Sequence, residues 1–381
     1  MFKFTLMKNF RAGQYISQGY YKSFQPSNIN RQFEIYNMEV LQLLSQADRE
    51  LGRLDMFSKY IPNIELFISM HVLKEATQSS RIEGTQTKMD EALLDIEDIP
   101  VDKRNDWEEV QNYIRALEWS IDELKDLPIS SRLILKTHKI LMQGVRGEQK
   151  QPGEFRTSQN WIGGASINDA MFIPPTHDKV PELMGDLEKF LHNDAIYIPE
   201  LLKLGLAHYQ FETIHPFLDG NGRVGRLLIP LYLVSKEILN KPILYLSDFF
   251  ERNRKLYYDN LMIVREDSNI TQWIKFFLVG IIETSRNGIK TFDSILQLQK
   301  QVDEKIQSLG SRSLKAKKVI DFLYEKPLIN AEKASEIADI SMPSTYKLVA
   351  DLEKLKILKE VTGGQRGRAY VFEDYLNLFR K

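Results

Sequence analysis

The chain has 381 residues, of which 43% are hydrophobic and 27% charged, with a formal net charge of −1 and no cysteine. Its length favours two or three domains. The charge argues against a uniformly basic nucleic-acid coat, and the lack of cysteine excludes disulfides, thiolate catalysis and Cys-ligated zinc. No stretch approaches the length of a membrane span, and the first residues lack a signal-peptide pattern. We therefore expect a cytoplasmic protein that is not associated with a membrane.

Helical patterns dominate after a first 35 residues that show no clear periodicity. Apolar residues recur at helical spacing after Pro62, which predicts a helix that runs to about Glu83 and is capped by Gly84. Further helices are expected over residues 89–96, 107–124 and 130–141.

The helical pattern then breaks. Residues 151–175 are rich in Gly, Pro and Asn, which predicts a loop and hairpin standing off a helical body. Beyond it, Pro199 suits the first turn of a helix that ends at Ile214. The other expected elements are a helix over 180–192, a loop over 215–221, a helix over 222–234, and two or three helices within 248–309.

The C-terminal segment differs in kind. Small polar residues at 308–312 indicate a linker, and three short helices are expected over 319–324, 332–338 and 343–355. Two strand-like pieces then flank a turn rich in Gly and Arg. Three helices and a β-hairpin predict a winged helix. The expected fold is mainly α, with a helical N-terminal region (1–115), a helical core bearing the hairpin (116–305) and a winged helix-turn-helix domain (311–381).

Residues 215–226 read His-Pro-Phe-Leu-Asp-Gly-Asn-Gly-Arg-Val-Gly-Arg and are the most informative stretch. If a helix begins near Gly222, its unpaired N–H groups and dipole would bind an anion. Arg223 and Arg226, three residues apart, would lie on one helix face and reach the same ligand. Asp219 could hold Mg²⁺ beside a polyphosphate, and His215 could accept a proton near neutral pH.

A solvated loop with a capping Asp and two surface arginines is the alternative for any one of these residues. The stretch is not a Walker loop, because the Lys-Ser/Thr pair after the second glycine is absent. It is not a Rossmann fingerprint either, because it follows a helical pattern rather than a strand.

The stretch resembles the signature of Fic-domain proteins, His-x-Phe-x-Asp/Glu-Gly-Asn-Gly-Arg-x-x-Arg, with every specified position matched. The resemblance implies a protein adenylyltransferase that moves AMP from ATP to a Tyr, Thr or Ser hydroxyl of a target protein or of itself. It implies that His215 is the catalytic base and that Asp219 binds Mg²⁺. The ATP-binding residues it implies are Gly220, Asn221, Gly222, Arg223, Val224, Gly225 and Arg226.

Ser79-Ser-Arg-Ile-Glu83-Gly84 resembles the inhibitory helix of some Fic proteins, which lies N-terminal to the core in the intramolecular class. That likeness implies that Glu83 pairs with Arg226 and blocks the γ-phosphate. The alternative is an ordinary last-turn glutamate. The same glutamate could also orient water to remove AMP from modified proteins.

Two further segments carry looser likenesses. Residues 160–164 and 172–175 resemble the family's flap, which docks the acceptor residue by strand addition. Tyr257 and Tyr258 resemble a tyrosine pair lining the adenine pocket, although they could be core aromatics on a helix. The remaining histidines show no ligand-like clustering and are interpreted as structural or surface residues: His71, His138, His177, His192 and His208.

The C-terminal segment has more than one reading. Residues 311–381 carry more basic than acidic side chains, with Arg366 and Arg368 at the turn and residues 344–347 early in the expected recognition helix. Winged helices bind DNA but also serve as protein-interaction or dimerisation modules, so a DNA or protein partner and a homodimer stay open. The principal rival hypothesis is a DNA-binding regulator whose Fic core senses ATP.

Overall fold

A computed structural model describes residues 10–34, 37–61, 64–144, 149–362 and 368–380. The fold is mainly helical, as the sequence predicts. Within the described residues, no helix is both long enough and apolar enough to cross a membrane. The helices are α1 (Met38–Lys59), α2 (Ile64–Ile82), α3 (Met89–Ala92), α4 (Arg104–Glu123), α5 (Ser131–Leu141), α6 (Val180–His192), α7 (Glu200–Ile214), α8 (Asn221–Ser235), α9 (Ser247–Arg252), α10 (Arg254–Asp267), α11 (Ile270–Gln307), α12 (Ser313–Glu325), α13 (Ala331–Ala338), α14 (Met342–Lys354) and α15 (Glu373–Leu376).

Two predicted boundaries differ from the structure. The helix expected over 89–96 ends at Ala92 and is followed by a separate 3₁₀ turn at Ile96–Asp98. Pro199 does not lie in the first turn of α7 but occupies its N-cap, with an extended backbone. The prediction was one position out because proline fixes only its own φ, which both positions accept.

An N-terminal hairpin was not expected from the sequence. Strands β1 (Gly13–Ser17) and β2 (Lys22–Pro26) pair antiparallel, with Tyr15 opposite Phe24. Most of β1 is exposed, so its residues show no alternation of apolar and polar types. Only β2 buries side chains, and Phe24 packs beneath Phe172 in the segment expected to form the flap.

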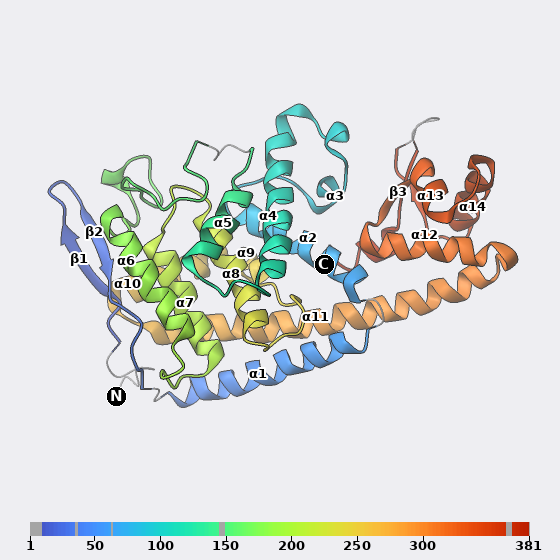
Figure 1. The fold of residues 1–381 in the computed structure, drawn as a ribbon. Coiled ribbons are helices and arrows are strands. Elements are labelled where there is room, and N and C mark those ends of the chain that lie inside the picture. Colours follow the sequence, from blue (N-terminus) through green and yellow to red (C-terminus); the bar gives the residue numbers. More distant parts are fainter. Residues whose placement is uncertain (1–9, 35–36, 62–63, 145–148, 363–367, 381) are drawn as a thin grey trace.

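The long helix α11 contacts both the helical core and the C-terminal unit. Its 38 residues span about 57 Å, and α1 packs along it (Figure 1). The N-terminal half of α11 enters the core, where Trp273 is fully buried and donates a hydrogen bond to the Gly205 carbonyl at 2.8 Å. The C-terminal half reaches out to the C-terminal unit.

Helices α7 and α8 pack against each other in the middle of the core. Nearly every residue of α7 is buried, so this helix shows no amphipathic stripe. The two helices are joined by the loop that begins the 215–226 motif. The motif is therefore held between two buried helices rather than at a solvated edge.

The C-terminal unit contains the three helices predicted for it, α12 to α14, and a three-stranded sheet. The strands are β3 (Leu328–Asn330), β4 (Lys359–Glu360) and β5 (Ala369–Val371), in the order β3-β5-β4, and β3 was not predicted. The turn between β4 and β5, with Arg366, lies outside the described residues. The expected linker at 308–312 is a short helical turn, Gly310–Arg312, that continues almost directly from α11 into α12.

Helix α2 is contacted by the C-terminal unit as well as by the core. Helix α12 packs on it, and the fully buried Phe67 lies 5.3 Å from Tyr324 and 6.5 Å from Tyr375 between ring centroids. The helix expected to be inhibitory therefore packs directly against the C-terminal unit.

We expect Phe67→Ala to lower the free energy of unfolding by about 3–5 kcal/mol, because it removes a buried ring that three elements share. Urea unfolding of the full chain measures the change. Leu256→Ala, at a half-exposed position of α10, is the control and should cost less than about 0.5 kcal/mol. Equal losses in the two variants would contradict this account of α2.

Candidate active site

The loop between α7 and α8 is shaped by two left-handed residues and one asparagine. His215 ends α7 with φ 50°, and Gly220 precedes α8 with φ 75°. The Asn221 side chain accepts from the Phe217 N–H and donates to the Phe217 carbonyl, both at 2.8 Å. The loop is thus closed on itself, and the N-terminus of α8 follows directly.

A histidine supports this loop from below. The His138 ring of α5 stacks on Phe217 with centroids 3.7 Å apart. Its Nε2 lies 3.1 Å from the Asp219 carbonyl, and its Nδ1 accepts from the Gly153 N–H at 2.9 Å. Because Nδ1 accepts, Nε2 carries the proton and the ring is neutral. This confirms the structural role expected for His138 and shows which loop it supports.

The flap segment is fastened to the motif by a buried arginine. The Arg156 guanidinium donates to the carbonyls of His215, Ile214 and Pro175. Asn160 adds a bond from its Nδ2 to the Phe217 carbonyl at 2.8 Å. The hairpin expected here has a single described bridge, between Ile162 and Phe172.

His215 lines a cavity of about 450 Å³ that lies between the motif, the flap segment and α10. Its Nδ1 is buried without a hydrogen-bond partner among the described residues. Burial, and then the charges of Arg265 and Arg156, lower the pKa of His215 to about 3. The imidazole is therefore neutral at physiological pH and able to accept a proton.

Arg226 lines the same cavity, with its guanidinium almost fully buried. Its Nε donates to the Ser79 hydroxyl at 2.8 Å and its Nη2 to the Ser79 carbonyl at 2.9 Å. The same Nη2 lies 2.6 Å from Glu83 Oε1. The structure thus brings together the three residues that the sequence singled out at two distant places.

Glu83 enters the site at Gly222, the first glycine of α8. A β-carbon on Gly222 would lie 2.2 Å from Glu83 Oε1, so this glycine leaves the space that the carboxylate occupies. Burial raises the pKa of Glu83, but the Arg226 charge and hydrogen bond outweigh it, and the net pKa lies below the usual value. The ion pair is therefore formed at neutral pH.

The remaining motif residues have other neighbours. Arg223 is buried and pairs with Glu109 at 3.1 Å and with Asp219 at 3.6 Å. The Asp219 side chain is half exposed, and its Oδ1 accepts from the Gly220 N–H. Val224 is buried, and Gly225 faces the Glu212 carboxyl, with no room for a β-carbon.

The two tyrosines differ in how deeply they are buried. Both rings line the cavity and lie 5.2 Å apart. Tyr257 is almost fully buried and its hydroxyl is 2.9 Å from His208 Nε2, whereas Tyr258 is only partly buried. Tyr257 thus belongs to the aromatic core, and Tyr258 is the more accessible ring.

Two cavity residues were not found by sequence reasoning. Glu212 lies one helical turn before His215, and its Oε1 is buried with no partner among the described residues. Burial raises the pKa of Glu212 to about 7, against the opposing charge of Arg226. Arg265 packs its guanidinium on the Phe172 ring at 3.7 Å and donates to the Glu212 carbonyl. The available signal for Glu212 was an acidic residue one helical turn before His215, in a helix that is mostly apolar.

Comparison with known proteins agrees with this geometry. The Fic/DOC family N-terminal profile matches residues 41–122, and the Fic/DOC family profile matches residues 128–233. A probable protein adenylyltransferase of Aquifex aeolicus is 26% identical over 303 residues, which are 78% of this chain and 85% of that protein. The protein adenylyltransferase Fic of Aedes aegypti is 30% identical over 149 residues. Those residues are 39% of this chain and 27% of the insect protein.

Solved structures share the fold. A Fic family protein from Desulfovibrio desulfuricans covers 90% of this chain and 98% of its own, with a TM-score of 0.57 and 19% identity. A Fic domain-containing signaling protein from Bacteroides thetaiotaomicron covers 67% of this chain and 96% of its own, with a TM-score of 0.52 and 18% identity.

The fold and the site together define a helical protein of the Fic class. The chain contains a Fic/DOC family N-terminal domain and a Fic/DOC family domain, and its curated relatives are named as protein adenylyltransferases, which are nucleotidyltransferases. It spans most of the Aquifex relative but about a quarter of the insect relatives.

We expect the free energy of unfolding to fall as the pH is lowered from about 6.5 towards 4. Burial lowers the pKa of His138 to about 4 from an ordinary 6.5, so the unfolded chain binds the proton first and stability is lost on acidification. Urea unfolding at a series of pH values measures the slope. His138→Gln should make it shallower, whereas His177→Gln, at an exposed position, should not.

Proposed function

We propose that this protein is an adenylyltransferase that transfers AMP from ATP to a Tyr, Thr or Ser hydroxyl of a target protein and of itself. The observation that carries the proposal is the cavity that is lined by both a neutral His215 and a buried Arg226. A base for a hydroxyl and a cation for a polyphosphate are what the reaction requires.

The proposed reaction is one in-line displacement. His215 takes the proton from the acceptor hydroxyl as its oxygen bonds to the α-phosphorus of ATP. The bond between the α-phosphorus and the bridging oxygen breaks, and pyrophosphate leaves. The buried Arg226 and the N-terminus of α8, with its close glycine Gly222, would hold the negative charge that leaves.

Mg²⁺ fits the donor set beside the loop. Asp219 presents a half-exposed carboxylate, and Mg²⁺ that bridges phosphates commonly takes one or two protein carboxylates. Within the described ranges, no group of three or more His, Cys, Asp or Glu side chains forms a cage for a metal ion. Asp219 is therefore the residue proposed to hold Mg²⁺, which would neutralise phosphate charge.

The adenine and the acceptor residue would occupy the outer cavity. Tyr258 gives an aromatic face for the base, and Tyr257 supports it from the core. The flap segment, with Trp161 and Ile162 at the cavity and one bridge from Ile162 to Phe172, would offer main-chain groups to an extended peptide. Main-chain pairing there would bring the acceptor hydroxyl towards His215.

We also propose that the enzyme is inhibited by its own α2. The Nε and Nη2 groups of Arg226 donate to Ser79 and Glu83, and the Glu83 carboxylate lies against Gly222. A γ-phosphate would have to displace this carboxylate, because like charges cannot share the site. Removal of AMP from modified proteins by a water that Glu83 orients is the alternative activity of the same site.

The C-terminal unit is proposed to be a winged helix that binds a partner. Tyr346 on α14 is half exposed, and the antiparallel strands β4 and β5 lie where the two strands of the wing are expected. A protein partner, DNA and a homodimer are the candidate ligands, and a cytoplasmic location is expected for a chain of this kind. The domain limits proposed are 1–115, 116–305 and 311–381.

We expect Glu83→Gly to raise automodification with Mg²⁺-ATP by about tenfold or more, because it frees Arg226 for the γ-phosphate. Mass spectrometry of the intact protein measures the AMP adduct. Glu97→Gly, which removes an exposed carboxylate elsewhere, is the matched control and should behave like the parent chain. Equal labelling of all three proteins would refute inhibition by Glu83.

We expect Glu83→Gly combined with His215→Ala to lose at least about a hundredfold in the rate of adduct formation, because the general base is removed. Nucleotide binding, measured by calorimetry, should persist in this double variant. Full activity without the histidine would overturn the mechanism. Nucleotide binding without any adduct in Glu83→Gly alone would favour the rival, an ATP-sensing regulator.

A further inference from the structure

A polar groove runs along α2 on a different side from Ser79 and Glu83. Three adjoining cavities of about 70, 390 and 410 Å³ form it, and Lys74 and Asp248 line all three. Its walls are α2, α9, α11 and the chain after α15. Cavities of this size suit a small molecule rather than a macromolecule.

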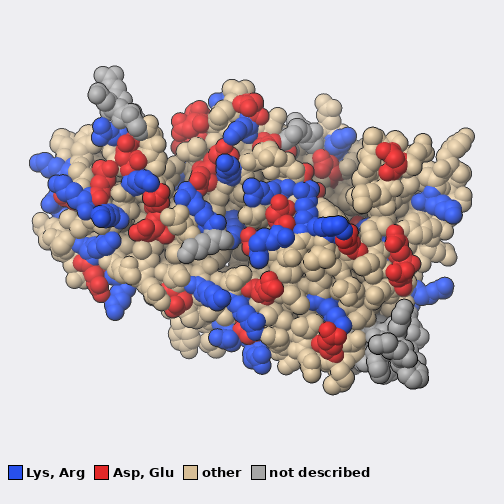
Figure 2. Space-filling view, turned by 180° about the vertical axis from the view of Figure 1, so that it is seen from behind, with Lys and Arg blue, Asp and Glu red and all other residues tan. Residues whose placement is uncertain are grey.

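The groove is rich in positive charge. Its lining has six basic side chains and three carboxyls; the basic ones are Lys74, Arg81, Lys88, Arg252, Lys290 and Arg380. Asp248 is shared between Lys74 at 3.7 Å and Arg252 at 3.1 Å. Figure 2 shows Lys and Arg side chains gathered across the middle of the face opposite to Figure 1. The surplus of cations favours an anion with several charges.

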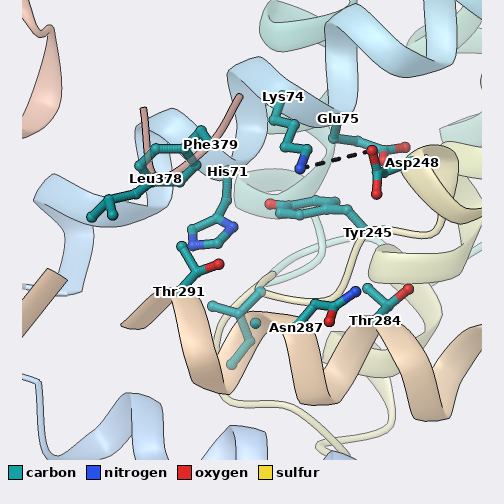
Figure 3. A pocket seen from close by; sticks show the side chains of 12 residues that line it. His71, Lys74, Glu75, Tyr245, Asp248, Thr284, Asn287, Thr291, Leu378 and Phe379 are labelled. Atoms are coloured by element: carbon teal, nitrogen blue, oxygen red, sulfur yellow. Dashed lines mark ion pairs between the residues drawn. The ribbon is translucent and has the colours of Figure 1, made fainter. Parts of the chain in front are cut away.

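The inner end of the groove is lined by side chains that can form hydrogen bonds. His71 projects towards Thr291, and Asn287 and Thr284 line the same cavity from α11 (Figure 3). His71 Nε2 is buried and has no hydrogen-bond partner among the described residues. Its ring is fixed between Phe292 and Phe379, at 4.8 and 5.0 Å. A buried polar atom left unpaired is costly, and a bound polar group would remove that cost.

The groove is connected to Arg226 through three side chains, which are Glu75, Tyr113 and Ser79. Glu75 lines the inner cavity and accepts hydrogen bonds from Tyr113 at 2.9 Å and from Ser247. The Tyr113 hydroxyl also interacts with Ser79, which holds Arg226. Because these contacts converge on α2, a ligand in the groove acts on the same helix that carries Glu83.

We propose that this groove binds a small phosphorylated ligand that holds α2 in its inhibitory position. The phosphates would bridge Lys74 of α2 to Arg252 of α9 and Lys290 of α11, and the inner polar groups would take the rest of the ligand. The groove is formed while Glu83 contacts Arg226. A ligand that binds this state preferentially must stabilise it. The regulatory part rests on the proposed adenylyltransferase activity, but the binding part does not.

Binding is tested with tripolyphosphate and the full chain in isothermal titration calorimetry, without ATP. We expect one site, with a Kd that rises about tenfold in Lys290→Glu and in Arg252→Gln. Lys125→Glu, an exposed reversal on another face, should leave the Kd unchanged. Lys290 is exposed on α11, so its reversal leaves the core intact, and circular dichroism checks the fold. No binding, or an equal Kd in all variants, would overturn the site.

Regulation is tested by automodification at saturating free Mg²⁺, with and without tripolyphosphate. We expect tripolyphosphate to slow the residual labelling of the parent chain at least about threefold and to lose this effect in Lys290→Glu. Slowing that persists in Lys290→Glu would mean competition at the ATP site and would overturn the regulatory part. Calorimetric binding without any slowing would do the same.

Discussion

The buried guanidinium of Arg226 is the charge around which the site is organised. A cation removed from water must be paired and hydrogen-bonded, and α2 supplies both the Ser79 groups and the Glu83 carboxylate. Burial alone would lower the pKa of Arg226, but Glu83 and the neighbouring tyrosines and Glu212 raise it above the ordinary value. The arginine therefore keeps its charge, and in the proposed mechanism a nucleotide phosphate replaces Glu83 as its partner.

This constraint explains why the glycines of the motif are where they are. Gly222 leaves room for Glu83, or for a phosphate in its place, and Gly225 leaves room for Glu212. Around His215 the surroundings have the opposite effect, because they disfavour the charged form of the side chain. There, Arg156, Arg265 and burial keep His215 neutral, so that its ring can take up a proton. One cavity thus keeps an arginine charged and a histidine uncharged within reach of the same ligand.

The position of α2 connects this chemistry to the rest of the chain. One side of the helix closes the site, another lines the polar groove, and Phe67 near its start packs on the C-terminal unit. The site, the groove and the C-terminal unit are therefore all in contact with the same helix. The proposed regulation needs no long pathway, because all three contacts lie on one helix.

The sequence by itself determined the helical class, most helix limits, and the roles proposed for residues 215–226, because helical periodicity and a dense motif are local properties. Predictions failed where the decisive contact was remote: the β1–β2 hairpin is held by pairing and by Phe24 against Phe172, not by an alternating pattern. Glu83 could be suggested from its surroundings in sequence, yet its 2.6 Å contact with Arg226 joins residues 143 positions apart. Only the tertiary structure decided this contact, because the two residues meet only in the folded chain. The same holds for the burial of the Glu212 carboxyl and for the groove along α2, which are formed by elements that are distant in sequence.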